Sequence, residues 1–310
     1  MSLVCLVHMG NYSDVIGKEK VMGNEKSIVN KVGDRKNYLW VLGIIVVIAL
    51  LSRFDVTFEL DTQTIALWRF NETERLLMDE SENFHQGYII GTSPIEGLFD
   101  QSRFFDGAKD YIIIPNTTAL NLVKQFTIEL WIYPMPSGAS EGAIFCKGWG
   151  NGGESYCLDL VKSEGRSYRF RFFIRGNSAV AAVMSDPIDF NNWYYLACVY
   201  NGSSIEIYVN GALSKSISAL FRIKTNSHDI SIGARKPSEA APYRLFFRGI
   251  IEEIRLSNRA RPQVEIHNYY KRHRPGITKG SYPYYFWGII AFCAMVILFA
   301  INNLKRWLYK

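Results

Sequence analysis

The chain has 310 residues, of which 48% are hydrophobic, enough for one large core or two small ones. Its 35 lysines and arginines exceed its 29 aspartates and glutamates, so the formal net charge is +6. This excess is modest, and no basic stripe on a recognisable nucleic-acid-binding module accompanies it, so we expect no nucleic-acid partner. Aromatic residues at 14%, together with 24 glycines, favour strands and turns over helices.

The first 37 residues are basic and precede an apolar run. Because an excess of lysine and arginine marks the cytoplasmic side of a membrane span, we predict that residues 1–37 are cytoplasmic. The run "YLWVLGIIVVIALL" (Tyr38 to Leu51) suits a signal peptide or a short anchor. "ALLSRF" places leucines where a cleavage site needs small residues. Residues 38–53 are therefore interpreted as an uncleaved signal anchor, with a removed peptide as the alternative.

Residues 54–262 follow as a series of short apolar or alternating segments with turn signals between them. Asn-Gly pairs at 201–202 and 210–211 mark tight hairpins around "SIEIYV". Many strands at this spacing predict an all-β fold, an antiparallel two-sheet jelly-roll sandwich. The predicted strands are "TIALWRF", "FTIELWIYP", "AIFCKG", "SYRFRFFIRG", "NWYYLACVYNG", "SIEIYVNG" and "RGIIEEIRL".

A short helix over Pro262 to Arg272 ("PQVEIHNYYKR") opens the segment 263–283, which continues as a basic stem. "YYFWGIIAFCAMVILFAI" then runs for 18 residues without a charge, about 27 Å as a helix. We predict a transmembrane helix over 284–302 and a cytoplasmic tail over 303–310. The stem is as basic as the tail, but the first span usually sets orientation. The sandwich is therefore expected outside the cell, anchored to the cell membrane.

An outside location has two consequences for the sandwich. Asn71, Asn116 and Asn201 begin the sequons "NET", "NTT" and "NGS" and become candidate glycosylation sites. Cys146 and Cys157 flank a glycine-rich loop between two strand-like runs and could form a disulfide across a hairpin. Unpaired core cysteines are the alternative.

Several segments in order carry a family resemblance. They are "ALWRFNE…DESENFHQG", "SRFFDGAKDYIIIPN", "LNLVKQFTIELWIYP", "AIFCKG", "NNWYYLACVYNGSSIEIYVNGAL", "ISIGAR" and "FFRGIIEEIRLSNRA". Together they resemble the laminin G-like, concanavalin A-like lectin/glucanase domain. The resemblance implies a curved two-sheet sandwich whose members mostly bind carbohydrate or protein, while a minority are glycosidases or lyases. Function must therefore be argued from sites.

Two adjacent glutamates bear on catalysis. Alternation along "GIIEEIRL" sends Glu253 to the face of Arg255 and Glu252 to the apolar face, with Ile250, Ile254 and Leu256. A glycosidase needs two carboxyl groups facing one sugar, roughly 5–10 Å apart. Since neighbours on a strand point apart, we expect no acid–base pair here and no enzyme. Glu253 is expected to pair with Arg255.

Glu252 on an apolar face requires compensation by hydrogen bonds, a cation or a metal. The resemblance implies a structural calcium here, held by Glu252 with Asp79, Asn83 and Asp106, because oxygen ligands suit calcium. Two departures oppose it: the early loop lacks the family's glycine, and a glutamate replaces the usual aspartate. A metal-free, hydrogen-bonded carboxylate is the alternative.

Ligand candidates fall on two strands and one loop. Arg169, Arg171 and Arg175 share a face of "SYRFRFFIRG" and could bind acidic sugars, although pairing with Glu129 or Glu206 is favoured. Other candidates are aromatic. Trp131 and Tyr133 alternate outward on "FTIELWIYP" and could stack against sugar rings, with burial by a covering loop or strand as the alternative. Trp149 lies on the glycine-rich loop "KGWGNGG". Histidines 85 and 228 are interpreted as solvated loop residues.

These features predict a non-enzymatic, membrane-anchored surface protein that recognises a glycan or a protein partner, with calcium as its one possible cofactor. An accessory subunit of a membrane or envelope assembly is the alternative. A glycosidase or lyase of this fold is a third hypothesis.

Overall fold

The computed structural model describes residues 58–164 and 167–275. The two predicted membrane spans, 38–53 and 284–302, the basic segment 1–37 and the tail 303–310 lie outside the described residues. Within 58–164 and 167–275, no helix is both long and apolar enough to span a membrane.

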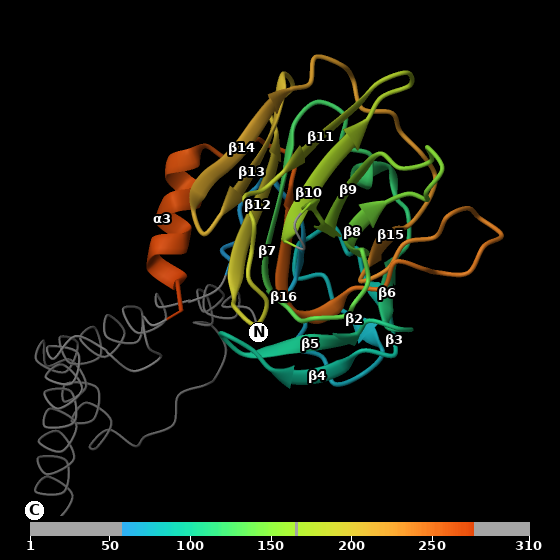
Figure 1. The fold of residues 1–310 in the computed structure, drawn as a ribbon, viewed down its shortest axis with the longest axis vertical. Coiled ribbons are helices and arrows are strands. Elements are labelled where there is room, and N and C mark those ends of the chain that lie inside the picture. Colours follow the sequence, from blue (N-terminus) through green and yellow to red (C-terminus); the bar gives the residue numbers. More distant parts are fainter. Residues whose placement is uncertain (1–57, 165–166, 276–310) are drawn as a thin grey trace, which may run out of the picture. The chain divides into compact units, whose positions relative to one another are not determined.

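The described strands form two antiparallel sheets that face each other (Figure 1). The first, sheet A, has the order β14 (Ala212–Ser218), β13 (Ser204–Val209), β12 (Tyr194–Tyr200), β7 (Phe126–Pro134), β16 (Arg248–Ser257), β5 (Gln101–Asp106) and β4 (Ser93–Glu96), and β1 (Thr64–Trp68) also pairs with β16. The second, sheet B, has the order β11 (Val180–Met184), β10 (Tyr168–Arg175), β9 (Tyr156–Lys162), β8 (Glu141–Lys147), β15 (Ile230–Ile232), β6 (Tyr111–Ile114), β3 (Gly87–Ile90) and β2 (Leu76–Leu77). The described elements also include a 3-10 helix, η1 (Thr118–Leu120), and an α-helix, α3 (Gln263–His273).

The main core lies between the sheets and follows the period-two pattern of the strands. The inward residues of β7 and β10 belong to it, as alternation predicts: Phe126, Ile128, Leu130, Ile132, Phe170, Phe172 and Ile174. Burying this much apolar surface is the dominant stabilising contribution to the sandwich, so a two-sheet all-β architecture follows from the pattern.

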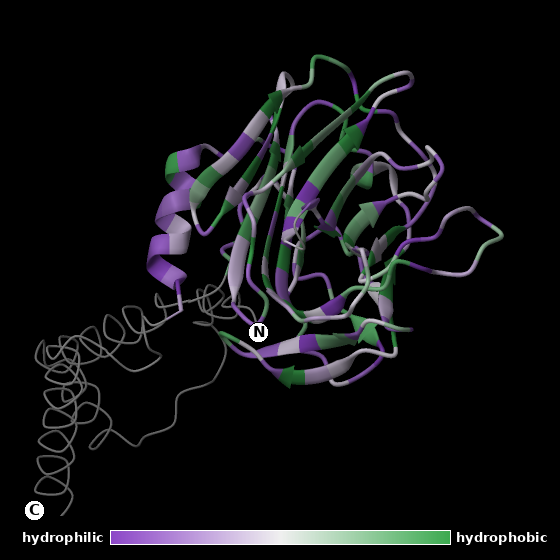
Figure 2. Cartoon of the chain, viewed as in Figure 1, coloured by the Kyte–Doolittle hydropathy of each residue, from purple (hydrophilic) through white to green (hydrophobic). Residues whose placement is uncertain are grey.

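Helix α3 begins one residue after Pro262, as the sequence predicts, and packs on the outer face of sheet A. Figure 2 shows α3 as largely hydrophilic, and its buried residues are Ile266 and Tyr269. They join a second apolar cluster that contains Phe58 and Trp131. This cluster gives sheet A an apolar layer on both of its faces.

The first and last described segments lie beside one another. The ring of Phe58 stacks on Tyr269 of α3, with 4.6 Å between ring centroids. Glu59 and His273 line the same small pocket. Both ends of the described region therefore emerge at one place on the sandwich.

The expected alternation of the two glutamates is wrong, because β16 contains a β-bulge. Glu252 pairs with Trp131 and Ile254 pairs with Leu130, so Glu253 is an extra residue, with a positive φ of 47°. Beyond the bulge the pattern shifts by one residue. Glu252 consequently leaves the apolar face and lies on the side of sheet A that α3 covers.

Each of these carboxylates has partners of its own. Glu252 accepts hydrogen bonds from the backbone N–H groups of residues 98–100, at 2.6 to 3.0 Å. Glu253 binds the backbone N–H of Phe58 at 3.1 Å and the guanidinium of Arg69 at 2.7 Å, in place of the expected Arg255. Only 1% of Glu252 and 2% of Glu253 is exposed, so neither faces an open groove.

Candidate functional site

Two of the proposed calcium ligands, Asp79 and Asn83, form hydrogen bonds within one loop and to strand β1. Asp79 accepts hydrogen bonds from the backbone N–H groups of Leu67, Ser81 and His85, at 2.8 to 2.9 Å. Asn83 donates from its side-chain amide to the carbonyl of Ile65. These contacts fasten the loop that follows β2 to strand β1.

The other two proposed ligands bind different loops. Asp106 accepts from the N–H groups of residues 108–110, and these hydrogen bonds lower its pKa although burial opposes this. Glu252 holds the turn at 97–100, where a Cβ on Gly97 would come within 2.7 Å of its carboxyl carbon. Among the described residues, no group of three or more histidine, cysteine, aspartate or glutamate side chains could hold a metal. The four side chains therefore do not fit a single calcium site.

The three arginines of β10 are engaged by neighbouring groups. Arg169 donates to the carbonyl of Ser185 at 2.7 Å. Arg171 forms ion pairs with Glu141 and the buried Asp159, at 2.7 and 2.6 Å. Pairing within the domain was expected, but the expected partners were wrong, because Glu129 and Glu206 lie on sheet A.

Arg175 lies 3.3 Å from Glu154 and completes this pattern. Near it, Cys146 and Cys157 face each other on β8 and β9 and form a disulfide. With Phe173 they make a small apolar cluster on the outer face of sheet B. The guanidiniums of Arg171 and Arg235 lie about 5.5 Å from the centre of the Phe173 ring. Packed side chains therefore cover this part of the outer face of sheet B.

The tryptophan of β7 is excluded as a surface platform. Trp131 is 0% exposed, and its ring packs edge-on against Phe99 with 5.4 Å between centroids. Its indole N–H donates to the hydroxyl of Tyr269 at 3.4 Å. The helix α3 thus buries it, whereas Tyr133 stays half-buried beside Trp193.

Trp149, in contrast, starts a row of half-buried rings. Its ring stacks on His228 with 3.7 Å between centroids. The Nζ of Lys236 lies 5.9 Å from the Trp149 ring and 5.1 Å from the Tyr243 ring. Tyr243 stacks in turn on Tyr111 at 4.0 Å. We call these five residues the aromatic row.

The aromatic row joins four separate segments, namely the β8–β9 loop, the segment before β15, the segment after β15 and strand β6. All five side chains are partly exposed. The sequence indicated only Trp149, since the other members are distant in the chain. The solvated interpretation was wrong for His85, which is buried, whereas His228 stays partly exposed with one face against an indole.

The three sequons differ in exposure. Asn71 is exposed, and its glycosylation stays a prediction. Asn201 is exposed, but its side-chain carbonyl accepts from the backbone N–H groups of Ser203 and Ser204. Asn116 is half-buried and accepts a hydrogen bond from Lys147 at 2.7 Å.

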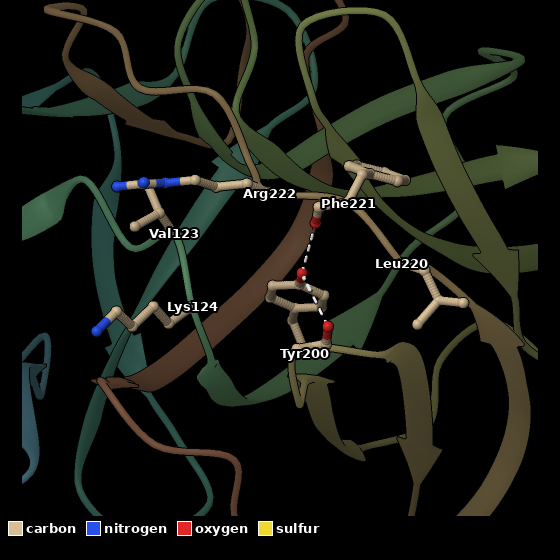
Figure 3. A pocket seen from close by; sticks show the side chains of 7 residues that line it. Val123, Lys124, Tyr200, Leu220, Phe221 and Arg222 are labelled. Atoms are coloured by element: carbon tan, nitrogen blue, oxygen red, sulfur yellow. Dashed lines mark hydrogen bonds between the residues drawn. The ribbon is translucent and has the colours of Figure 1, made fainter.

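A second hollow lies at the ends of β7, β12 and β14 (Figure 3). It has a volume of about 490 Å³ and is lined by Val123, Lys124, Tyr200, Gly202 and residues 220–222. We call it the cationic hollow, because Lys124 and Arg222 are at its edge. Tyr200 donates from its hydroxyl to the carbonyl of Phe221 at 2.6 Å.

The model of the concanavalin A-like lectin/glucanases superfamily (Laminin_G_3) matches residues 92–267, more than half of the chain. The chain belongs to this superfamily. No curated protein matches the sequence. The expected fold family is thereby confirmed, and it agrees with the two antiparallel sheets of the structure.

Solved structures of the same fold include domain 4 of AbnA, a GH43 extracellular arabinanase from Geobacillus stearothermophilus, in complex with arabinotriose. It has a TM-score of 0.51 and 17% identity, and the match covers 67% of this chain and 98% of that one. The binding domain of Paraclostridial Mosquitocidal Protein 1 matches with a TM-score of 0.54, 14% identity, 67% of this chain and 52% of that one. The binding domain of botulinum neurotoxin DC, in complex with rat synaptotagmin II, has a TM-score of 0.54 and 14% identity over 69% of this chain and 52% of that one. The superfamily member described here thus spans about half of these toxin chains, and the likeness concerns the fold.

Proposed function

We propose that this protein is a non-enzymatic recognition protein that is displayed outside the cell and binds a glycan through the aromatic row. The observation that carries the proposal is the row itself, with an ammonium group between two half-exposed rings. Rings of this kind offer an apolar surface to a sugar ring, and polar tips to its hydroxyl groups. The fold is compatible with this role, because the neighbours include a domain in complex with arabinotriose.

Membrane display is part of the proposal. Glu59 and His273 line one pocket, so the two ends of the described region lie at the same place. Two anchors, at 38–53 and 284–302, could then hold the sandwich on one side of a single membrane. The disulfide supports an oxidising location outside the cytoplasm. The absence of catalysis is proposed because Glu252 and Glu253 are buried and held by other groups.

The test is a glycan array probed with the purified full chain, followed by titration of the best glycan. Tyr243→Ala should weaken binding by about fivefold, since stacking of one ring contributes on the order of 1 kcal/mol. Tyr133→Ala removes a half-buried ring on sheet A and should leave the affinity unchanged. Equal binding by wild type and Tyr243→Ala would overturn the assignment of the aromatic row.

A further inference from the structure

The cationic hollow is separate from the aromatic row and has a different chemistry. It opens where β12 ends at Tyr200, whereas the first and last described segments contact Tyr195, near the start of that strand. Five residues of strand separate the two places, about 17 Å. A partner bound in the hollow would therefore lie away from the point where the chain leaves the sandwich.

The two cations at the hollow have no acidic partner among residues 58–164 and 167–275. Within the described part of the chain, neither Lys124 nor Arg222 forms an ion pair. Arg171 and Arg175 on β10, in contrast, form ion pairs. Two unpaired cations beside an open hollow attract an anionic ligand.

The walls of the hollow favour an apolar group over a sugar. Leu220 is 79% exposed, and Val123 and Phe221 are half-buried. The hydroxyl of Tyr200 is already bonded to the carbonyl of Phe221 and lies 3.4 Å from that of Gly202. Apart from Lys124 and Arg222, few side-chain hydrogen-bonding groups line the hollow for the many hydroxyls of a saccharide, and unpaired hydroxyls would oppose binding.

We propose that the cationic hollow binds a protein segment in which acidic residues flank one apolar side chain. The apolar side chain contacts Leu220 and Phe221, which line the hollow together with Tyr200; Figure 3 shows these three residues. The flanking carboxylates form ion pairs with Lys124 and Arg222. Apolar contact supplies affinity, while the two charges orient the segment along the hollow.

The test measures binding of fluorescein-labelled pentapeptides to the full chain by polarisation. The probes carry Gly-Asp-X-Asp-Gly, with X as leucine, methionine or phenylalanine. Matched probes have asparagine in place of both aspartates, or glycine in place of X. We expect at least one acidic probe with an apolar X to bind saturably, with a Kd below about 1 mM. Both matched probes should bind about tenfold more weakly, and so should the acidic probe at high salt.

Variants then locate the site. K124E/R222E should weaken binding by about tenfold or more, because two attractions become repulsions. Leu220→Asp tests the apolar wall at a largely exposed residue and should also weaken binding. Lys162→Glu reverses an exposed charge on β9, so it should bind as the wild type does. Circular dichroism checks that each variant is folded.

Several results would overturn the proposal. One is that no acidic probe binds at about 1 mM, and another is that the asparagine probes bind equally well. A third is that Lys162→Glu weakens binding as much as K124E/R222E. Phosphatidylcholine vesicles with phosphatidylserine form a separate arm, and binding of these vesicles but of no peptide would assign the hollow to a lipid surface. Glycan binding at the aromatic row is unaffected by any of these outcomes.

Discussion

The carboxylate of Glu253 accepts a hydrogen bond at 3.1 Å from the backbone N–H of Phe58, which lies 195 residues earlier in the chain. Arg69 binds the same carboxylate and also donates to the carbonyl of Phe58 at 2.9 Å. The guanidinium of Arg255 lies 4.4 Å from the Phe58 ring centroid. A bulged glutamate thus helps to fasten the first described segment to sheet A and α3.

Glu253 should make stability depend on pH. Burial raises its pKa from 4.5 to about 7, although Arg69 and the Phe58 N–H oppose the rise. A raised pKa in the folded state means that the stability due to the proton is complete below the unfolded pKa and is lost as the pH rises through about 7. The unfolding free energy of the wild type, minus that of Glu253→Gln, should therefore fall between pH 4.5 and 7. Above pH 7 this difference should stay level. Urea unfolding at several pH values measures this difference.

Glu80→Gln is the matched control, since Glu80 is the exposed partner of the same guanidinium. This variant keeps Glu253 and should retain the fall in stability between pH 4.5 and 7. A Glu253→Gln difference that is constant, or that rises across this range, would contradict the raised pKa.

Glu129 should be among the most costly side chains to neutralise. It is completely buried and lies 2.8 Å from both Arg255 and Arg261, and it accepts a hydrogen bond from Tyr195 at 2.5 Å. Burial alone would raise the pKa of Glu129, but the two arginines hold it below its usual range. Glu129→Ala leaves both guanidiniums without this partner and should cost about 3–5 kcal/mol.

Urea unfolding measures the loss, and Lys215→Ala is the comparison. Lys215 and Asp186 form an ion pair at 3.4 Å in which both side chains are largely exposed. Removing such a pair should change stability little. Comparable losses in the two variants would show that the buried network is not the stabilising feature proposed here.

The disulfide should stabilise the domain through the hairpin that it closes. Cys146 and Cys157 are 11 residues apart. Closing a loop of this length restricts the unfolded chain, and C146A/C157A should lower the unfolding free energy by about 2–3 kcal/mol. Reductant should lower wild-type stability similarly and leave C146A/C157A unchanged. Cys198→Ala, which removes the free buried cysteine, should keep the response to reductant; its loss in that variant would point to a different pairing.

Calcium should not stabilise the domain. The oxygens of Asp79, Asp106 and Glu252 accept backbone hydrogen bonds from three separate segments, namely strand β1, residues 108–110 and residues 98–100. A site with calcium at 100 times its Kd would add about 2.7 kcal/mol. This corresponds to roughly 5–10 °C in a domain of this size. Melting curves with calcium and with chelator should coincide, and a rise of that size, lost in Asp79→Asn, would restore the calcium prediction.

Much of the sandwich could be predicted because alternation reports burial directly. The inward residues of β10, the strand Phe126–Pro134 and the helix after Pro262 follow from local patterns. The bulge could not be predicted, since a glutamate with a positive φ has no sequence signal. It moved Glu252 to the other face of β16.

The functional surfaces were harder to predict because they join distant segments. Trp131 alternates outward as expected, yet α3 covers it, and strand periodicity carries no information about a covering helix. Trp149 was identified from its glycine-rich loop. Tyr243 and Tyr111 are distant from it in the sequence, and only the fold of sheet B and its loops places them in the same row. Lys124 and Arg222 are ordinary loop cations in sequence, and only the fold places them at one hollow.

Because the segments around Glu59 and His273 lie together, the sandwich could be inserted as a domain into a surface loop of an unrelated host protein. The host backbone would have to bridge only a short gap, so neither partner would need to unfold to accommodate the other.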